Sequence, residues 1–424
     1  FKDRYLAELT LRYDGSQNFA VDSRWGLFPG MSLGWRISEE DFFKKKISFI
    51  EELKLKASWG KLGNDRVAPF QYLSTYTLGN GPMLGSDPKR LKGFTIGRLA
   101  NPNITWEEVD TKNAGFESMF LNRLLSFNFE YFYSMRKKIL TPKLASIPAY
   151  AGLTLPDQNI GEVSNSGMEI EIMHRNKYTN GSYYIGGNVT YAKNKIHFFD
   201  EAANVPEWQR RTNHSIDSWL VYKSDGLYQT QKEIDETPHL LNTVPGDIKY
   251  LDVDEDGKIT SNDRVRIYQS AIPEIVYGIN MGGTWKDFEL NVLWTGQARA
   301  KQMIRPGAYN RDVTYFENRW ISAEQTPNAK YPRAFDRDDS FNSKDSDFWL
   351  KDASFIRLKN VEFAYNLPKS LLNRFKIGNV RVFVSGFNLF SIDNIKVQDP
   401  EGAQSGGMYY PQQRIYNFGL NISF

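Results

Sequence analysis

Cysteine is absent from the 424-residue sequence, which excludes disulfides, thiol catalysis and zinc–thiolate centres. No apolar run approaches the roughly 18–20 residues that a membrane-spanning helix needs. The charges nearly cancel, with 53 Lys and Arg against 50 Asp and Glu, so no strongly cationic surface is available and nucleic-acid binding is not expected. Histidine is scarce and scattered, and no H-E-x-x-H pair occurs. The four histidines are His174, His197, His214 and His239.

Motifs of common enzyme classes are missing as well. The sequence has no G-x-S-x-G nucleophile elbow, no P-loop and no dinucleotide-binding glycine pattern. Adjacent acids such as Glu39–Glu40, Glu51–Glu52 and Asp338–Asp339 are explained as solvated loop charges. We therefore expect a protein that is not an enzyme.

Aromatic residues, in contrast, are abundant, because 28 Phe, 23 Tyr and 10 Trp make up 14% of the chain. Many of them lie in segments where apolar and polar residues alternate strictly. In residues 4–14, for example, Tyr5, Leu9 and Tyr13 share one face and Glu8 lies on the other. A period of two residues indicates β-strands with one apolar and one wet face.

The alternating segments predict an all-β fold of roughly twelve strands, most of about ten residues or more. Strands of soluble proteins typically have about five or six residues, whereas a tilted strand crosses a bilayer with about 9–11. Short and long connections alternate along the chain, as in outer-membrane barrels with short periplasmic turns and long outer loops. The sequence therefore predicts an antiparallel transmembrane β-barrel. Its long loops lie near 64–109, 141–165, 197–273, 301–353 and 391–412.

The last predicted strand supports the same interpretation. Tyr416, Phe418, Leu420 and Ile422 share one face, and the segment ends on Phe424. Aromatic side chains at strand ends suit the two interfacial girdles of a barrel, where amphipathic rings lie at the level of the lipid headgroups.

Eight segments, in order along the chain, carry a family resemblance; they are Arg24–Phe43, Leu53–Asn64, Ile104–Glu117, Asn159–Ile172, Val244–Val265, Phe355–Pro368, Arg381–Phe390 and Tyr409–Phe424. Together they resemble the SusC-like TonB-dependent transporters (RagA/SusC type) of the Bacteroidetes outer membrane. The resemblance implies a plugged barrel of about 22 strands. Residues 1–424 are then expected to supply about its last 12 strands, and the N-terminal plug is expected to lie outside this chain.

The resemblance also implies partners and cargo. A SusD-like surface lipoprotein is expected to cap the barrel, and TonB–ExbB–ExbD is expected to drive import through the N-terminal part. The expected cargo is a glycan or an oligopeptide, and the pattern does not choose between them. A multi-pass barrel in outer-membrane lipid is implied, with a possible dimer of transporter–lipoprotein pairs. Alone, this portion is expected neither to seal nor to transport.

One local motif predicts a metal site. Asp252, Asp254, Asp256 and Asp263 occupy positions 1, 3, 5 and 12 of an EF-hand-type loop, and the Lys258 carbonyl stands at position 7. Carboxylates this close repel one another unless a cation lies between them. We expect a structural Ca²⁺ that stiffens a long outer loop, although the usual Glu at position 12 is an Asp and no flanking helix pair is evident. The alternative is a metal-free Asp- and Gly-rich turn.

Other interpretations of the fold remain open at this point. A passive outer-membrane porin of about twelve strands would need neither plug nor energy. A secreted all-β glycan-binding protein would make no membrane contact. The long loops hold Trp208, Trp219, Trp320 and Trp349, which could bind cargo or pack loop against loop, so no substrate-binding residue is named.

Overall fold

The architecture is one large antiparallel sheet whose strands follow each other in chain order. The computed structural model describes residues 1–84, 89–97, 99–143, 156–306, 313–334, 341–375, 377–402, 410 and 412–424. Within them, a 12-stranded sheet comprises β1 (Tyr5–Gly15), β2 (Trp25–Arg36), β3 (Ile50–Asn64), β6 (Glu107–Phe120), β7 (Leu125–Thr141), β8 (Gln158–Tyr178), β9 (Gly181–Phe198), β14 (Ile275–Trp285), β15 (Phe288–Ala298), β18 (Phe355–Asn366), β19 (Asn379–Asp393) and β20 (Ile415–Ser423).

The remaining elements are short and lie in the connections. Four two-stranded sheets pair β4 (Tyr76–Leu84) with β5 (Lys89–Ile96), β10 (Leu220–Tyr222) with β13 (Arg264–Arg266), β11 (Ser224–Leu227) with β12 (Ile248–Tyr250), and β16 (Lys301–Met303) with β17 (Leu350–Asp352). The α-helices are α1 (Asp41–Lys46), α2 (Gln231–Asp235), α3 (Val313–Glu317) and α4 (Lys369–Leu372). Single 3₁₀ turns occupy Val21–Ser23, Ile37–Glu39, Glu207–Gln209, Ser261–Asp263 and Asn373–Phe375.

No helix among the described residues is both long and apolar enough to cross a membrane.

Register makes the two faces of the sheet continuous from strand to strand. On one face, the pairing aligns an apolar row: Leu55, Phe116, Phe129, Ile170 and Val189. One residue farther along, the pairing aligns a polar row on the opposite face: Lys56, Gly115, Glu130, Glu169 and Thr190. Side chains of a strand alternate between the two faces. We call the face with the apolar row the lipid face and the face with the polar row the lumen face.

The apolar residues of the lipid face are exposed instead of forming a compact interior. Leu9 is 80% exposed, Leu420 57% and Trp35 36%. Burying such side chains would be favourable, and a soluble protein rarely leaves an apolar face that continues across many strands exposed to water. The lipid face is therefore expected to contact the hydrocarbon layer of a membrane. This agrees with the barrel that the alternation predicts.

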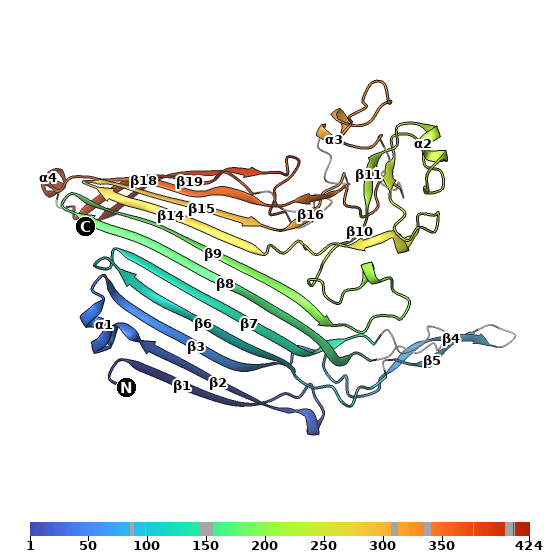
Figure 1. The fold of residues 1–424 in the computed structure, drawn as a ribbon, viewed down its shortest axis with the longest axis horizontal. Helices are drawn as coiled ribbons and strands as arrows, with labels where there is room; N and C mark the ends of the chain where they lie inside the picture. The colour runs from blue at the N-terminus through green and yellow to red at the C-terminus, as the bar shows by residue number, and fades with distance from the viewer. Residues whose placement is uncertain are drawn as a thin grey trace.

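Figure 1 shows that the long connections gather at one end of the sheet and the short ones at the other. Helices α1 and α4 lie at the short-turn end, whereas α2, α3 and β10 lie at the long-loop end. The strand bounds differ from the expected loop near 141–165, because β7 continues to Thr141 and β8 begins at Gln158.

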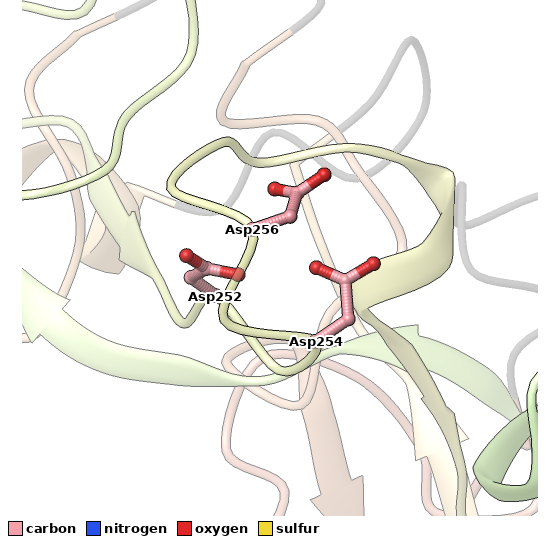
Figure 2. Close-up of side chains that lie close together, drawn as sticks. All are labelled: Asp252, Asp254 and Asp256. Carbon is pink, nitrogen blue, oxygen red and sulfur yellow. The ribbon is translucent and has the colours of Figure 1, made fainter.

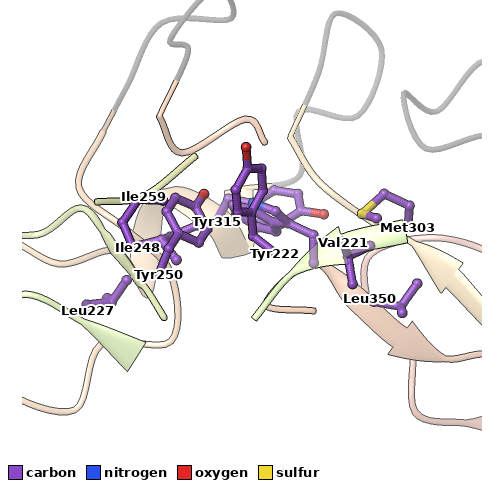
Figure 3. Packing of buried hydrophobic residues seen from close by; sticks show 10 residues of the cluster. Val221, Tyr222, Leu227, Ile248, Tyr250, Ile259, Met303, Tyr315 and Leu350 are labelled. Atoms are coloured by element: carbon purple, nitrogen blue, oxygen red, sulfur yellow. The ribbon is translucent and has the colours of Figure 1, made fainter. Parts of the chain in front are cut away.

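Two of the long connections fold together around a core of their own. Val221, Tyr250, Met303, Trp349 and Leu350 belong to one buried cluster, to which segments 197–273 and 301–353 both contribute (Figure 3). Val221 and Trp349 are fully buried. We call this unit the loop module, and its shared core ties two otherwise independent loops into one body.

Candidate functional site: the lumen face and the acidic loop

The lumen face of β3, β6, β7 and β8 carries a network of ionised side chains. Lys56 lies between two carboxylates, with Nζ 2.6 Å from Glu130 Oε2 and 3.3 Å from Glu117 Oε1. Lys54 adds a longer pair to Glu117 at 3.5 Å. Charges of this kind are tolerated in a water-filled interior and are costly against lipid. The network thus identifies which side of the sheet is wet.

The same face is hollowed and rich in hydrogen-bonding groups. A concave surface of about 600 Å³ is lined by Lys56, Glu130, Glu169, Glu171 and Asn188, among others. Asn128 Nδ2 donates to Glu171 Oε2 at 3.3 Å. Such a surface can contact water, a hydrated solute or a polar protein segment.

The acidic loop between β12 and β13 brings together three of its four predicted aspartates. One carboxylate oxygen from each of Asp252, Asp254 and Asp256 lies within 4.8 Å of the others, and Figure 2 shows the three side chains grouped around the turn. Gly257, with φ of +82°, reverses the chain in a conformation that a residue with a Cβ rarely adopts. Its N–H donates to Asp252 Oδ2 at 2.8 Å.

Asp263 has a different place from the other three aspartates. Its side chain is fully buried, and its two oxygens accept from the N–H of Val253 at 2.7 Å and of Thr260 at 2.6 Å. With Thr260 it forms a capping box on the 3₁₀ turn. In this geometry Asp263 holds the loop closed, while Lys258 donates its N–H to Asp256 Oδ1 at 2.8 Å.

The electrostatics of the loop suit a hard cation. Asp252 Oδ1 and Asp254 Oδ1 are shielded from water and have no hydrogen-bond partner among the described residues. Desolvation raises the pKa of the Asp254 carboxyl, and so do the nearby charges of Asp263 and Asp256. Three clustered carboxylates plus backbone carbonyls are the oxygen donors that Ca²⁺ prefers.

The acidic loop is anchored to the loop module. Ile259, at the apolar position 8 of the motif, is only 8% exposed and belongs to the core shared by the two long loops. Order in the turn is therefore coupled to order in the module, since Ile259 lies three residues after Asp256 and is part of the core.

Two of the loop tryptophans hydrogen-bond across the two long loops, and two do so within their own loop. Each indole N–H donates to a partner elsewhere in the outer segments: Trp208 to the Asn262 carbonyl, Trp219 to the Lys301 carbonyl, Trp320 to Gln229 Oε1 and Trp349 to the Asn342 carbonyl. A buried, hydrogen-bonded indole contributes to structure. Through Trp219 and Trp320, indole hydrogen bonds connect segments 197–273 and 301–353.

Two buried charged contacts were not apparent from the sequence. Asp247, fully buried, accepts from Arg333 Nε and Asn342 Nδ2, both at 2.7 Å, and so joins the two loops of the module. Arg357 on β18, 3% exposed, holds Asp399 through two bonds of 2.8 Å and also pairs with Glu401. These partners are more than forty residues apart, so no local pattern signals them.

Comparison with known proteins identifies relatives of the whole chain. The family model for TonB dependent receptor-like β-barrels matches residues 1–389. TonB-dependent receptor P26 of Formosa agariphila is 28% identical over 454 aligned residues, covering 100% of this chain and 45% of the relative. TonB-dependent receptor SusC of Bacteroides thetaiotaomicron is 26% identical, with 100% of this chain and 42% of SusC covered. The chain thus spans less than half the length of these relatives.

A solved structure shares the fold. The RagAB peptide transporter aligns with a TM-score of 0.78 and 21% identity, over 100% of this chain and 46% of that chain. The chain therefore shares its fold with just under half of that chain.

Proposed function

The chain belongs to the TonB dependent receptor-like β-barrel family, and on that premise we propose that it forms the barrel portion of an outer-membrane importer of the SusC/RagA type. The barrel lies in the outer membrane. In this proposal a bulky nutrient enters through the long-loop end, crosses the polar lumen and leaves toward the periplasm. The energy for import comes from TonB–ExbB–ExbD, which acts on the N-terminal part of the full-length protein.

The single observation that carries the proposal is the two-faced sheet. Twelve consecutive strands keep one apolar face turned outward and one hydrogen-bonding face turned inward. An apolar outer surface needs lipid, and an ionised inner surface such as the Lys56–Glu130 pair needs water. Both conditions hold together in a membrane protein that encloses an aqueous passage.

We further propose a SusD-like surface lipoprotein as the partner at the long-loop end. Support comes from the similarity to SusC and to the RagAB peptide transporter. The cargo of this protein is proposed as a glycan, an oligosaccharide or an oligopeptide. A polar lumen face lined by carboxylates, amides and hydroxyls can hydrogen-bond either class.

Uptake measurements test the transport proposal. The full-length gene is deleted from its host, and uptake of labelled oligosaccharide and peptide mixtures is compared with that of the complemented strain, with and without a protonophore. We expect uptake to depend on the gene and to stop when the proton gradient collapses. Gene-dependent uptake that continues under the protonophore would instead identify a passive porin. Release of the protein by carbonate washing of membranes would identify a secreted binding protein.

We propose in addition that the acidic loop binds Ca²⁺ through Asp252, Asp254 and Asp256, with the Lys258 carbonyl as a further ligand. Asp263 stabilises the loop by accepting hydrogen bonds from the N–H groups of Val253 and Thr260. The ion would neutralise the clustered carboxylates and stiffen the loop module through Ile259. Its role is structural, because the loop lies outside the strands.

Metal removal tests this second proposal on the full-length protein. At a Ca²⁺ concentration a hundredfold above the dissociation constant, binding stabilises the module by about 2.7 kcal/mol. We expect trypsin to cut within 197–273 many times faster in EDTA than in Ca²⁺. The Asp254→Asn variant should lose most of this difference, while Asp235→Asn on α2 should keep it. Equal cleavage of wild-type protein in both buffers would contradict the proposal.

A further inference from the structure

We propose that the lipid face of β3, β6, β7, β8 and β9 carries a binding site for phosphate groups of anionic lipid in the outer leaflet. The site is a set of six lysines, here called the lysine belt, that follows the apolar surface at the long-loop end. The inference depends on the location of the barrel in the outer membrane and not on the cargo. The belt consists of Lys61, Lys112, Lys137, Lys138, Lys193 and Lys195.

Register places five of these lysines in consecutive rows on one face, and Lys138 follows Lys137 at a β-bulge. The row Trp59, Lys112, Tyr133, Ser166 and Lys193 is aligned by direct strand pairing across five strands. Two residues farther toward the loops, pairing aligns the row Lys61, Asp110, Met135, Ser164 and Lys195. Lys137 lies opposite Glu108 in the row after that.

Their height above the apolar surface matches the headgroup layer. The row below them consists of Ala57, Ala114, Tyr131, Met168 and Tyr191. Each further row adds two residues, or about 7 Å along a strand and less along the membrane normal because strands tilt. The headgroup region on each side of the hydrocarbon core is about 5–8 Å thick. The lysine belt therefore begins where lipid phosphates lie.

The charge of the belt is not cancelled locally. Six lysines face two carboxylates, Glu108 and Asp110, and Glu162 lies beyond them at a β-bulge. Glu108 is shared, with Oε2 2.6 Å from Lys61 Nζ and Oε1 2.6 Å from Lys138 Nζ. Asp110 instead accepts from Trp59 Nε1 at 3.1 Å.

Three lysines are available to a ligand. Among the described residues, Lys112, Lys137 and Lys195 enter no ion pair, and Lys112 and Lys137 are exposed. Lys193 Nζ lies 4.1 Å from the centre of the Tyr268 ring. A row of ammonium groups at headgroup height attracts anionic lipid and can hydrogen-bond phosphate oxygens.

The opposite ends of the same strands have a different character. At the short-turn end the lipid face carries the row Phe120, Leu125, His174 and Ile185. The cationic rows thus belong to the long-loop side, which is the outer leaflet. The chemistry that fits is a phosphorylated glycolipid headgroup held from the side by several ammonium groups.

Lipid retention by the purified full-length protein tests the inference. The detergent-solubilised protein is incubated with lipid A, with enzymatically dephosphorylated lipid A, and with inorganic phosphate, and bound lipid is measured by native mass spectrometry. We expect lipid A to be retained and the dephosphorylated form not to be. The triple variant Lys112→Gln, Lys137→Gln, Lys195→Gln should bind lipid A at least tenfold more weakly, because each lysine near a charged surface contributes separately.

A matched variant gives the control. Lys44→Gln, Lys45→Gln, Lys46→Gln on α1 removes the same charge at the other end of the sheet and should leave retention unchanged. Heat-modifiable migration on gels shows that both variants fold. Equal retention by the belt variant and the wild type would overturn the inference. So would equal retention of dephosphorylated lipid A, or displacement of the lipid by millimolar inorganic phosphate, which would indicate a site for the free ion.

Discussion

At the scale of single residues, the most consequential side chain is the buried carboxylate of Asp247. It accepts from Arg333, from Asn342 and, at 2.9 Å, from the Val244 N–H. Asp247→Ala removes one acceptor from three donors at a fully buried position, which should destabilise the loop module by about 2–3 kcal/mol. Trypsin should then cut the outer segments of the full-length protein faster, while heat-modifiable migration of the barrel persists.

The exposed Asp225 provides the control for that prediction. Its partner Lys249 keeps a second contact with Glu233 at 3.1 Å, so Asp225→Ala should leave the cleavage rate unchanged. If both substitutions accelerate cleavage alike, charge in the loops and not the buried contact is responsible.

At the scale of the secondary-structure element, neighbouring residues of one strand should respond in opposite ways to the same change. On β8, Ile170 lies on the lipid face and Glu169 on the lumen face. Ile170→Arg places a cation in the hydrocarbon layer and should cost about 2–4 kcal/mol near the midplane. Glu169→Arg faces water and should cost far less.

Urea titration of the full-length protein in lipid vesicles measures this difference. The midpoint should fall for Ile170→Arg and stay near the wild-type value for Glu169→Arg. The reverse order would mean that the two faces of the sheet have been assigned to the wrong solvents.

At the scale of the whole molecule, the sheet has two edge strands. In the part of the chain that the structure describes, β1 pairs with β2 alone and β20 with β19 alone, so each edge presents backbone groups that need a partner. Expressed by itself, the 424-residue chain should fail to give a trypsin-resistant, heat-modifiable band. The full-length protein should give one. A stable folded band from the chain alone would show that it closes without further strands.

Local patterns and long-range contacts differ in how far the sequence predicts them. Alternation in residues 4–14 identifies β1, because the period of two depends only on neighbours along the chain. The three-residue strand β10 is too short to show a period. The spacing of the acidic motif places Asp263 at position 12, but the direction of its carboxylate, toward the N–H of Thr260, follows from the fold of the turn.

The shared core of the loop module also limits how the protein can be re-engineered or diversify. Segments 197–273 and 301–353 bury Val221 and Trp349 in the same cluster, so a transplant of either segment into another barrel would leave half a core without its complement. Recombination between related receptors should succeed only when both segments are inherited as a pair.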